Sequence, residues 1–130
     1  MVTVNELPPK TAQETYVNFS KLKESFGSEE FNFVLFYGNP TDTEISWCPD
    51  CRSIHVDFMR FAKEYRGATR FHTVPVGSHE EFNRDNPFIK AVPHLEAVPT
   101  FAVYGKHIVY LKMVDPTFED IVYFAKKHKL

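Results

Sequence analysis

The chain has 130 residues, of which 43% are hydrophobic and 25% are charged. This length and composition predict a single globular domain over residues 1–130 and exclude a disordered or fibrous protein. A net charge of −2 and the absence of a long apolar run argue against nucleic acid and membranes as partners. The first residues have neither the basic start nor the apolar stretch of a secretory signal, so we expect a cytoplasmic protein. We also expect it to be a monomer.

The chain opens with a strand pattern and a helix pattern. Residues 2–7 alternate weakly and predict a short strand. Thr11 and Glu14 then have the spacing of a capping box, which predicts a helix from there to about Phe26. A strand followed by a helix is the first part of a crossover between parallel strands.

The middle of the chain repeats this pattern more clearly. Residues 31–37 form a nearly continuous apolar and aromatic run, which is typical of a strand buried on both faces. The polar loop 38–46 leads from this strand to Trp47 and two cysteines. A helix is predicted after the cysteines and ends at Gly67. Its apolar stripe consists of Ile54, Phe58, Phe61, Ala62 and Tyr65.

The last part of the chain predicts a strand over 70–76, a short helix, and a strand over 98–104. A two-residue hairpin turn at Gly105-Lys106 joins the second strand to another over 107–114. Asp115-Pro116 predicts the N-cap and first turn of a final helix. The apolar face of that helix consists of Phe118, Ile121, Val122 and Ala125.

This order of elements predicts an α/β fold. Alternating strands and helices imply parallel strands joined by helical crossovers, and the closing hairpin adds antiparallel strands to the same sheet. The expected architecture is a central mixed sheet with helices on both faces, which is the arrangement of the thioredoxin fold.

Two cysteines are present, Cys48 and Cys51, and they lie three positions apart. A disulfide that closes so short a loop has little structural use in a cytoplasmic protein, so we expect the pair to react. Cys48 falls at the N-terminus of the predicted helix, with Pro49 in its first turn. Unpaired N–H groups and the helix dipole stabilise a thiolate at that position.

The spacing of the cysteines predicts unequal roles. An exposed Cys48 would open a substrate disulfide and form a mixed disulfide with it. Cys51, one turn inside the helix and more buried, would then attack Cys48 and release the reduced product. Trp47 is expected to shield the nucleophile.

The segment 97–100 is similar to the cis-proline loop of thioredoxin-fold proteins. This resemblance implies that Pro99 packs against the cysteines. It also implies that Val98 and Thr100 belong to the substrate-binding surface, where Val98 offers its backbone to an extended segment.

The motif Ser46-Trp47-Cys48-Pro49-Asp50-Cys51 resembles that of the cytosolic fourteen-kilodalton thioredoxin-related proteins. The likeness covers most of the chain and includes the long loop 38–46, Val76-Gly77 and the segment 85–88. It implies electron flow from NADPH through thioredoxin reductase, and substrates such as cystine and nitrosylated or persulfidated cysteines. It implies neither a bound cofactor nor a metal.

The chain also departs from that family. Phe82 and Ile89 stand where the family has tryptophan and arginine, so the edge of the substrate groove is expected to differ. The buried acid of ordinary thioredoxins would fall near Leu35, and residues 31–37 contain no acid. Asp50 or a water molecule is therefore the candidate that helps Cys51 lose its proton.

Acidic residues surround the cysteine motif in the sequence. Asp42, Glu44 and Asp50 lie close to Cys48, with Arg52 as the nearby base. If these acids share the rim of the site, they disfavour the thiolate and repel acidic partners. Asp50 is equally well explained as an acid that suits a helix N-terminus.

Three other interpretations stay open. The cysteine pair is half of a zinc site only if two further ligands join it. A glutathione-dependent glutaredoxin would share the fold and use Cys48, although Pro49-Asp50 replaces its usual Pro-Tyr pair. A redox-inert adaptor is the non-enzymatic alternative. The histidines that could complete a metal site are scattered: His55, His72, His79, His94, His107 and His128.

Overall fold

The helices and strands follow one another in the predicted order. The computed structural model describes residues 4–27, 31–65, 69–91, 95–105 and 109–127. The elements are β1 (Val4–Glu6), α1 (Ala12–Glu24), β2 (Phe31–Tyr37), α2 (Pro49–Glu64), β3 (Thr69–Pro75), α3 (Pro87–Lys90), β4 (Thr100–Tyr104), β5 (Val109–Val114) and α4 (Phe118–Lys127). Gly67, Lys106 and His107, which the sequence places at predicted boundaries, lie outside the described residues.

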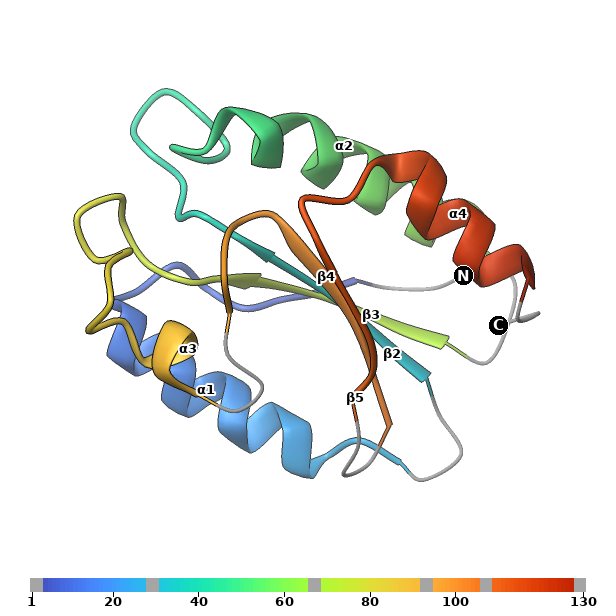
Figure 1. Ribbon diagram of the computed structural model, residues 1–130, viewed down its shortest axis with the longest axis horizontal. Coiled ribbons are helices and arrows are strands. Elements are labelled where there is room, and N and C mark those ends of the chain that lie inside the picture. The colour runs from blue at the N-terminus through green and yellow to red at the C-terminus, as the bar shows by residue number, and fades with distance from the viewer. Residues whose placement is uncertain (1–3, 28–30, 66–68, 92–94, 106–108, 128–130) are drawn as a thin grey trace.

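The strands form one mixed sheet in the order β1-β3-β2-β4-β5. β3 pairs in parallel with both β1 and β2, whereas β4 is antiparallel to β2 and β5 is antiparallel to β4. Figure 1 shows α2 and α4 on one face of the sheet and α1 and α3 on the other. The predicted mixed sheet with helices on both faces is confirmed. No helix of the described segments is long and apolar enough to cross a membrane.

The central strand β2 is buried on both faces, as its continuous apolar run predicts. Phe33 and Leu35 pack into the core cluster beneath α2 and α4, and Val34 and Phe36 pack into the cluster beneath α1. Burial of each such side chain contributes roughly 1.5–3 kcal/mol. A strand held from both sides gives the following loop, and hence the cysteine motif, a fixed starting point.

Helix α1 begins with the predicted cap in a modified form. Thr11 Oγ1 accepts a hydrogen bond from the Glu14 N–H at 3.2 Å, and the Thr11 hydroxyl donates to Glu14 Oε1 at 2.8 Å. The glutamate carboxylate therefore bonds the threonine side chain instead of the threonine N–H. The helix ends at Glu24, two residues before the expected Phe26.

The predicted N-cap of the last helix is wrong. Asp115 has a φ of 50°, and its N–H donates to the Pro99 carbonyl at 2.8 Å, so it turns the chain at the end of β5. Thr117 is the cap instead. Its Oγ1 accepts the Asp120 N–H at 3.2 Å, and its own N–H donates to Asp120 Oδ2 at 3.0 Å. This pair satisfies two helix donors at once, which an Asp-Pro start cannot do.

Strand β4 begins at Thr100, two residues later than predicted. Pro99 has no N–H to donate to a ladder, so regular pairing starts after it. The strand β3 lies one residue earlier than expected, at Thr69–Pro75. These shifts leave the order and the faces of the strands unchanged.

Candidate active site

Cys48 is the N-cap residue of α2, as the motif predicts. Its backbone is extended, Pro49 occupies the first turn, and its Sγ accepts a hydrogen bond from the Cys51 N–H at 3.3 Å. This N–H is one of the donors that a helix N-terminus leaves unpaired. The Cys48 sulfur that accepts it lies at the positive end of the helix dipole.

Both sulfurs belong to free cysteines, and both are more buried than a surface nucleophile would be. Cys51 is fully buried, as expected, but Cys48 is only 6% exposed, so the prediction of an exposed Cys48 is wrong. The cysteines form a cluster with Tyr37, Trp47 and Val98 that covers the attacking sulfur. A substrate disulfide therefore has a narrow approach to Cys48.

The cis-proline loop lies beside the cysteines. The Val98–Pro99 peptide bond is cis, in agreement with the resemblance noted from the sequence. The Val98 carbonyl accepts a hydrogen bond from the Cys48 thiol at 3.6 Å. Thr100 is buried, and its hydroxyl donates to the Ala97 carbonyl at 2.6 Å. The loop thus presents the Val98 backbone to the attacking sulfur, while the Thr100 hydroxyl is used within the loop.

Trp47 is anchored by the loop that follows β3. Its indole N–H donates to the Gly77 carbonyl at 2.9 Å, and its ring lies 4.8 Å from the ring of His79 and 5.8 Å from that of Phe82. A Cβ atom at Gly38 would lie only 2.4 Å from Trp47 Cε2. Phe82, one of the departures from the family pattern, therefore contacts the tryptophan beside Cys48.

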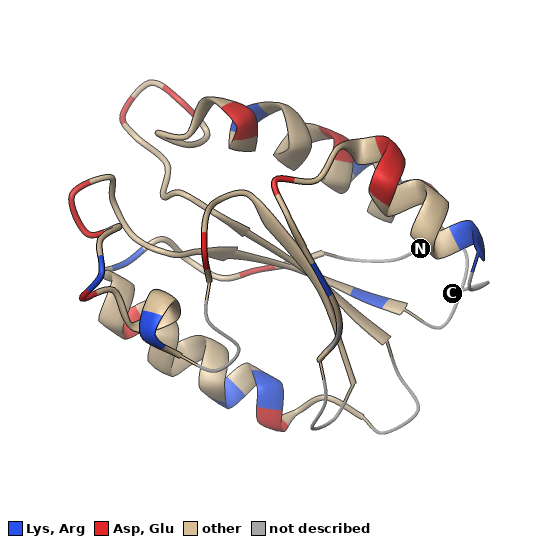
Figure 2. Cartoon of the chain, in the orientation of Figure 1, with Lys and Arg blue, Asp and Glu red and all other residues tan. Residues whose placement is uncertain are grey.

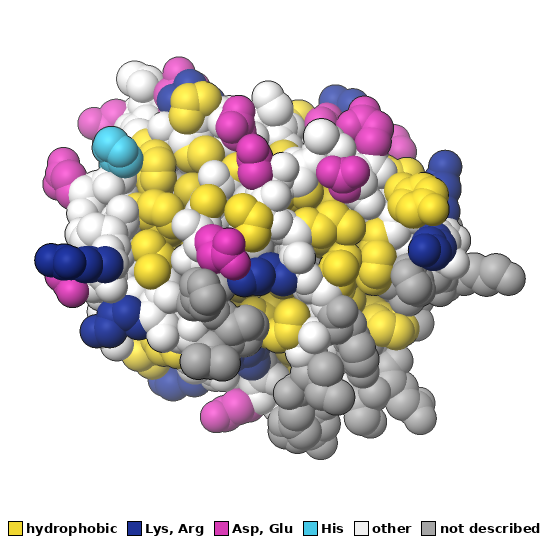
Figure 3. Space-filling model, in the orientation of Figure 1, with side chains coloured by type: hydrophobic (Ala, Val, Ile, Leu, Met, Phe, Trp, Pro, Cys, Tyr) yellow, Lys and Arg dark blue, Asp and Glu magenta, His cyan; other side chains and the backbone are white. Residues whose placement is uncertain are grey.

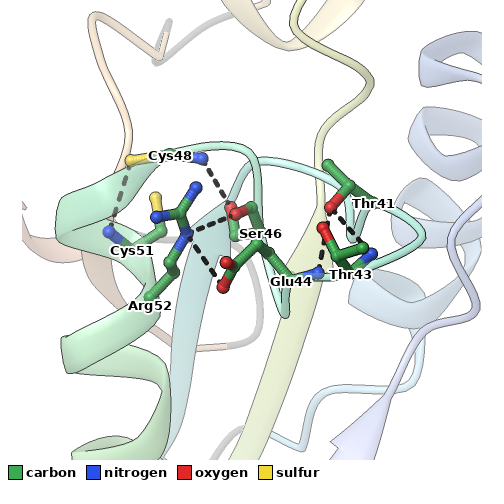
Figure 4. A network of polar contacts seen from close by, with 7 residues as sticks. All are labelled: Thr41, Thr43, Glu44, Ser46, Cys48, Cys51 and Arg52. Carbon is green, nitrogen blue, oxygen red and sulfur yellow. Dashed lines mark hydrogen bonds and ion pairs between the residues drawn. The ribbon is translucent and has the colours of Figure 1, made fainter.

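A polar network ties the long loop to α2 (Figure 4). Arg52 Nε donates to the Ser46 carbonyl at 2.8 Å and lies 3.6 Å from Glu44 Oε2. The Ser46 side chain in turn accepts the Cys48 N–H at 3.1 Å. Ser46 is fully buried and links Arg52 to the backbone of the attacking cysteine. Sequence reasoning assigned Ser46 and Arg52 no such role, although a serine two residues before a helix cap was a usable signal.

The acidic rim is smaller than expected because Glu44 is paired with Arg52. Asp42 and Asp50 are exposed. Figure 2 shows acidic residues on the loop before α2 and on the first turn of that helix, and Figure 3 shows acidic side chains gathered over α2 and α4. The surface beside the cysteines is therefore acidic, with one of its three predicted carboxylates neutralised.

Cys51 lies in an environment that opposes ionisation. Burial raises the pKa of its thiol strongly, and the nearby Cys48 sulfur raises it further. Leu35, at the position of the missing acid, is fully buried. Asp50 is exposed, and within the described segments it makes no hydrogen bond or ion pair with Cys51. The two cysteines therefore differ in environment, because Cys48 caps the helix and the Cys51 thiol is buried with a raised pKa.

In the described part of the chain, no group of three or more histidine, cysteine or acidic side chains could hold a metal ion. His55 lies on α2, His72 on β3 and His79 in the loop after β3. The remaining histidines, His94, His107 and His128, lie outside the described residues.

Comparison with known proteins agrees with this geometry. The profile of the thioredoxin domain of thioredoxin domain-containing protein 17-like proteins matches residues 12–122. No curated protein matches the chain significantly by sequence.

Solved structures of thioredoxins share the fold. Chlamydomonas reinhardtii thioredoxin f2 is 17% identical with a TM-score of 0.64, covering 97% of this chain and 96% of that one. Schistosoma mansoni thioredoxin is 21% identical with a TM-score of 0.59, covering 96% and 94%. Malassezia sympodialis thioredoxin is 15% identical with a TM-score of 0.67, covering 100% and 94%. At these identities the likeness establishes the fold alone.

Proposed function

The chain belongs to the family of thioredoxin domain-containing protein 17-like thioredoxin domains, and from this premise we propose that it is a thiol–disulfide oxidoreductase. The single observation that carries the proposal is the hydrogen bond of 3.3 Å from the Cys51 N–H to Cys48 Sγ at the start of α2. It supports the proposal because it brings a helix N–H to the Cys48 sulfur and comes from the residue that carries the second thiol.

The reaction has two steps. The Cys48 thiolate attacks one sulfur of a substrate disulfide, so that a mixed disulfide forms and the first substrate thiolate leaves. Cys51 then loses its proton and attacks Cys48 Sγ, which forms the Cys48–Cys51 disulfide and releases the second substrate thiolate. The second step is intramolecular, so the Cys51 thiol has a high effective concentration at the mixed disulfide. The substrate is therefore released quickly.

The substrates that we propose are small disulfides such as cystine, selected protein disulfides, and nitrosylated or persulfidated cysteines. The near-complete burial of Cys48 favours substrates that present a slim, extended segment to Val98, Trp47 and Pro99. The acidic surface beside the site disfavours acidic ones. We further propose that thioredoxin reductase, using NADPH in the cytoplasm, returns the oxidised protein to its dithiol form.

A coupled assay tests this function. NADPH consumption is followed with thioredoxin reductase and the protein, with cystine, insulin or a nitrosothiol as substrate. We expect turnover with cystine and the nitrosothiol and slow turnover with insulin. The same assay with glutathione and its reductase distinguishes a glutaredoxin. A redox-inert adaptor would give no turnover with any electron donor, which would refute the proposal.

A further inference from the structure

Glu6 of β1 lies in the same row of the sheet as Leu35 of β2. Thr73 pairs with Leu35 on one side and with Glu6 of β1 on the other. Directly paired residues of neighbouring strands point to the same face, and Leu35 packs into the core beneath α2. Glu6, which is exposed, therefore belongs to the α2 face, at the edge of the sheet.

A histidine lies between that acid and the cysteines. His55 is four residues after Cys51 on α2, so the two side chains share one helix face, with Cβ atoms about 5–6 Å apart. The His55 ring is 9% exposed and lies 4.8 Å from the ring of Tyr37, which itself packs against Cys51. Tyr37 thus contacts both the histidine and the buried thiol.

A cleft connects this group to solvent. It has a volume of about 390 Å³, and Glu6, Pro8, Tyr37, Ile45 and His55 are among the residues that line it. Thr73 Oγ1, fully buried in the row next to Glu6, completes no hydrogen bond of ordinary length. Burial and the charge of Glu6 raise the pKa of the Tyr37 hydroxyl to about 12, and the nearby Thr73 side chain opposes this shift in part. The lining of the cleft is mostly apolar, but it includes polar groups of Glu6, Tyr37 and His55, so the cleft has room and partners for water.

Burial at this position favours a neutral imidazole. Burial lowers the pKa of His55 below its usual 6.5, and the negative charge of Glu6 opposes that shift. Within the described segments, the titratable groups that line the cleft with His55 are Glu6 of β1 and Tyr37 of β2, and Cys51 and Arg52 lie one turn before His55 on α2. A neutral imidazole supported by a carboxylate has the chemistry of a general base.

We propose that His55 accepts the proton of Cys51 in the second step of the reaction, through Tyr37 or a water molecule of the cleft, with Glu6 stabilising the imidazolium. This inference rests on the proposed disulfide reductase function and concerns only the resolving step. As the Cys51 sulfur attacks Cys48 Sγ, the bond between Cys48 and the substrate sulfur breaks. The proton held by His55 then passes to the leaving thiolate or to water, so the imidazole returns to its neutral form.

A single-turnover experiment separates the two steps. The reduced protein is mixed in a stopped-flow instrument with an equimolar amount of dithiodipyridine, a neutral disulfide whose released thiopyridone absorbs light. The first release reports the attack by Cys48, and the second reports the attack by Cys51. In His55→Asn we expect the first release to stay within about twofold of wild type. The second should slow about tenfold to a hundredfold at pH 7.

Two matched variants accompany the measurement. Val56→Asn introduces the same residue at the next, exposed position of α2 and should leave both releases unchanged. Glu6→Gln removes the supporting charge and should slow the second release about two- to fivefold. If His55→Asn does not fold, His55→Gln provides the same test, with circular dichroism as the check on folding.

The pH dependence separates a proton acceptor from a structural residue. In the wild type, the rate of the second release should fall once the pH drops below the pKa of His55, which lies under 6.5. Above that pKa the rate should not depend on pH. In His55→Asn its rate should instead rise about tenfold per pH unit, because hydroxide then removes the proton. Free imidazole should restore the second release in His55→Ala.

The outcomes are distinct. A normal first release with an unchanged second release in His55→Asn overturns this inference and leaves the proposed function intact. A slowed second release in Asp50→Asn alone would also overturn it, because the base would then be Asp50. Absence of both releases in the wild type would refute the proposed function itself.

Discussion

The backbone N–H of Cys51 donates to the sulfur of Cys48 across 3.3 Å, so the residue that is proposed to resolve the mixed disulfide also stabilises the sulfur that forms it. The two roles use different atoms of Cys51. Its N–H acts on the thiolate in the first step, and its thiol acts in the second. Substitution of the Cys51 side chain should therefore leave the first step intact, because the backbone donor remains.

Ser46 links the long loop to this site, and its removal has a calculable cost. In Ser46→Ala the buried Cys48 N–H loses its acceptor, which should lower the free energy of unfolding by about 1–3 kcal/mol. Urea unfolding followed by circular dichroism measures the loss. Thr43→Ala, in the exposed part of the same loop, is the control and should change stability by less than about 0.5 kcal/mol. Equal losses in the two variants would contradict the assigned role of Ser46.

Gly38 is required because Trp47 occupies the space of a side chain there. The Cβ of Gly38→Ala would lie 2.4 Å from Trp47 Cε2, so the indole must move away from the Gly77 carbonyl. We expect a loss of about 1–3 kcal/mol in unfolding free energy and an altered tryptophan emission spectrum. In a Trp47→Ala background the same substitution should cost much less, since the clash is gone. A cost that persists in that background would place the strain elsewhere.

His72 should make the protein unstable in acid. Its Nε2 lies 3.0 Å from Asn32 Oδ1 and its Nδ1 lies 3.4 Å from Asn5 Nδ2, contacts that a neutral ring protonated on Nε2 satisfies. Burial lowers the pKa of His72 to about 4. Between pH 6.5 and pH 4 the unfolded chain takes up a proton that the folded chain does not. The free energy of unfolding therefore decreases as the pH is lowered, by about 3 kcal/mol in total.

Urea unfolding at several pH values between 7.5 and 4 checks this dependence. His72→Gln removes the titrating group and keeps a hydrogen-bonding side chain, so its stability should vary less over that range. Part of the slope should remain in the variant because burial also lowers the pKa of His55. Parallel curves for the variant and the wild type would show that His72 is not responsible.

Asp50 is predicted to act through its charge on substrate selection. A carboxylate about 7 Å from a substrate charge contributes roughly 0.6 kcal/mol at the dielectric of water, which is about threefold in rate. Asp50→Asn should raise the rate for an acidic disulfide by up to that factor at low salt and leave a neutral disulfide unaffected. Asp57→Asn, two turns further along α2, is the matched control. A gain that is equal for both substrates and insensitive to salt would indicate another role for Asp50.

Local patterns in the sequence were sufficient for the order of the elements and for the place of the cysteine pair. The run 31–37 and the proline after Cys48 determine their structures within a few residues, so they can be read without the rest of the chain. The N-cap of α4 could not be predicted in this way. Asp115-Pro116 and Thr117 with Asp120 are both valid local signals, and the bond from Asp115 to Pro99 decides between them.

The features of the site that were missed depend on residues far apart in the sequence. Cys48 is buried in a cluster that includes Tyr37 and Val98, both of them distant from it in the chain. The cleft between Glu6 and His55 exists because β1 adds to the sheet edge beside β3, opposite the start of α2. The sequence alone presents His55 as one of several scattered histidines.

The unequal roles of the two cysteines are the central claim, and trapping of a mixed disulfide tests them most directly. Cys48→Ser and Cys51→Ser are each mixed with cystine, and the masses of the intact proteins are measured by mass spectrometry. Cys51→Ser should gain the mass of one half-cystine, because Cys48 attacks and nothing resolves the product. Cys48→Ser should stay unmodified, since its remaining thiol is fully buried and the pKa of that thiol is raised. An adduct on Cys48→Ser with none on Cys51→Ser would contradict the account.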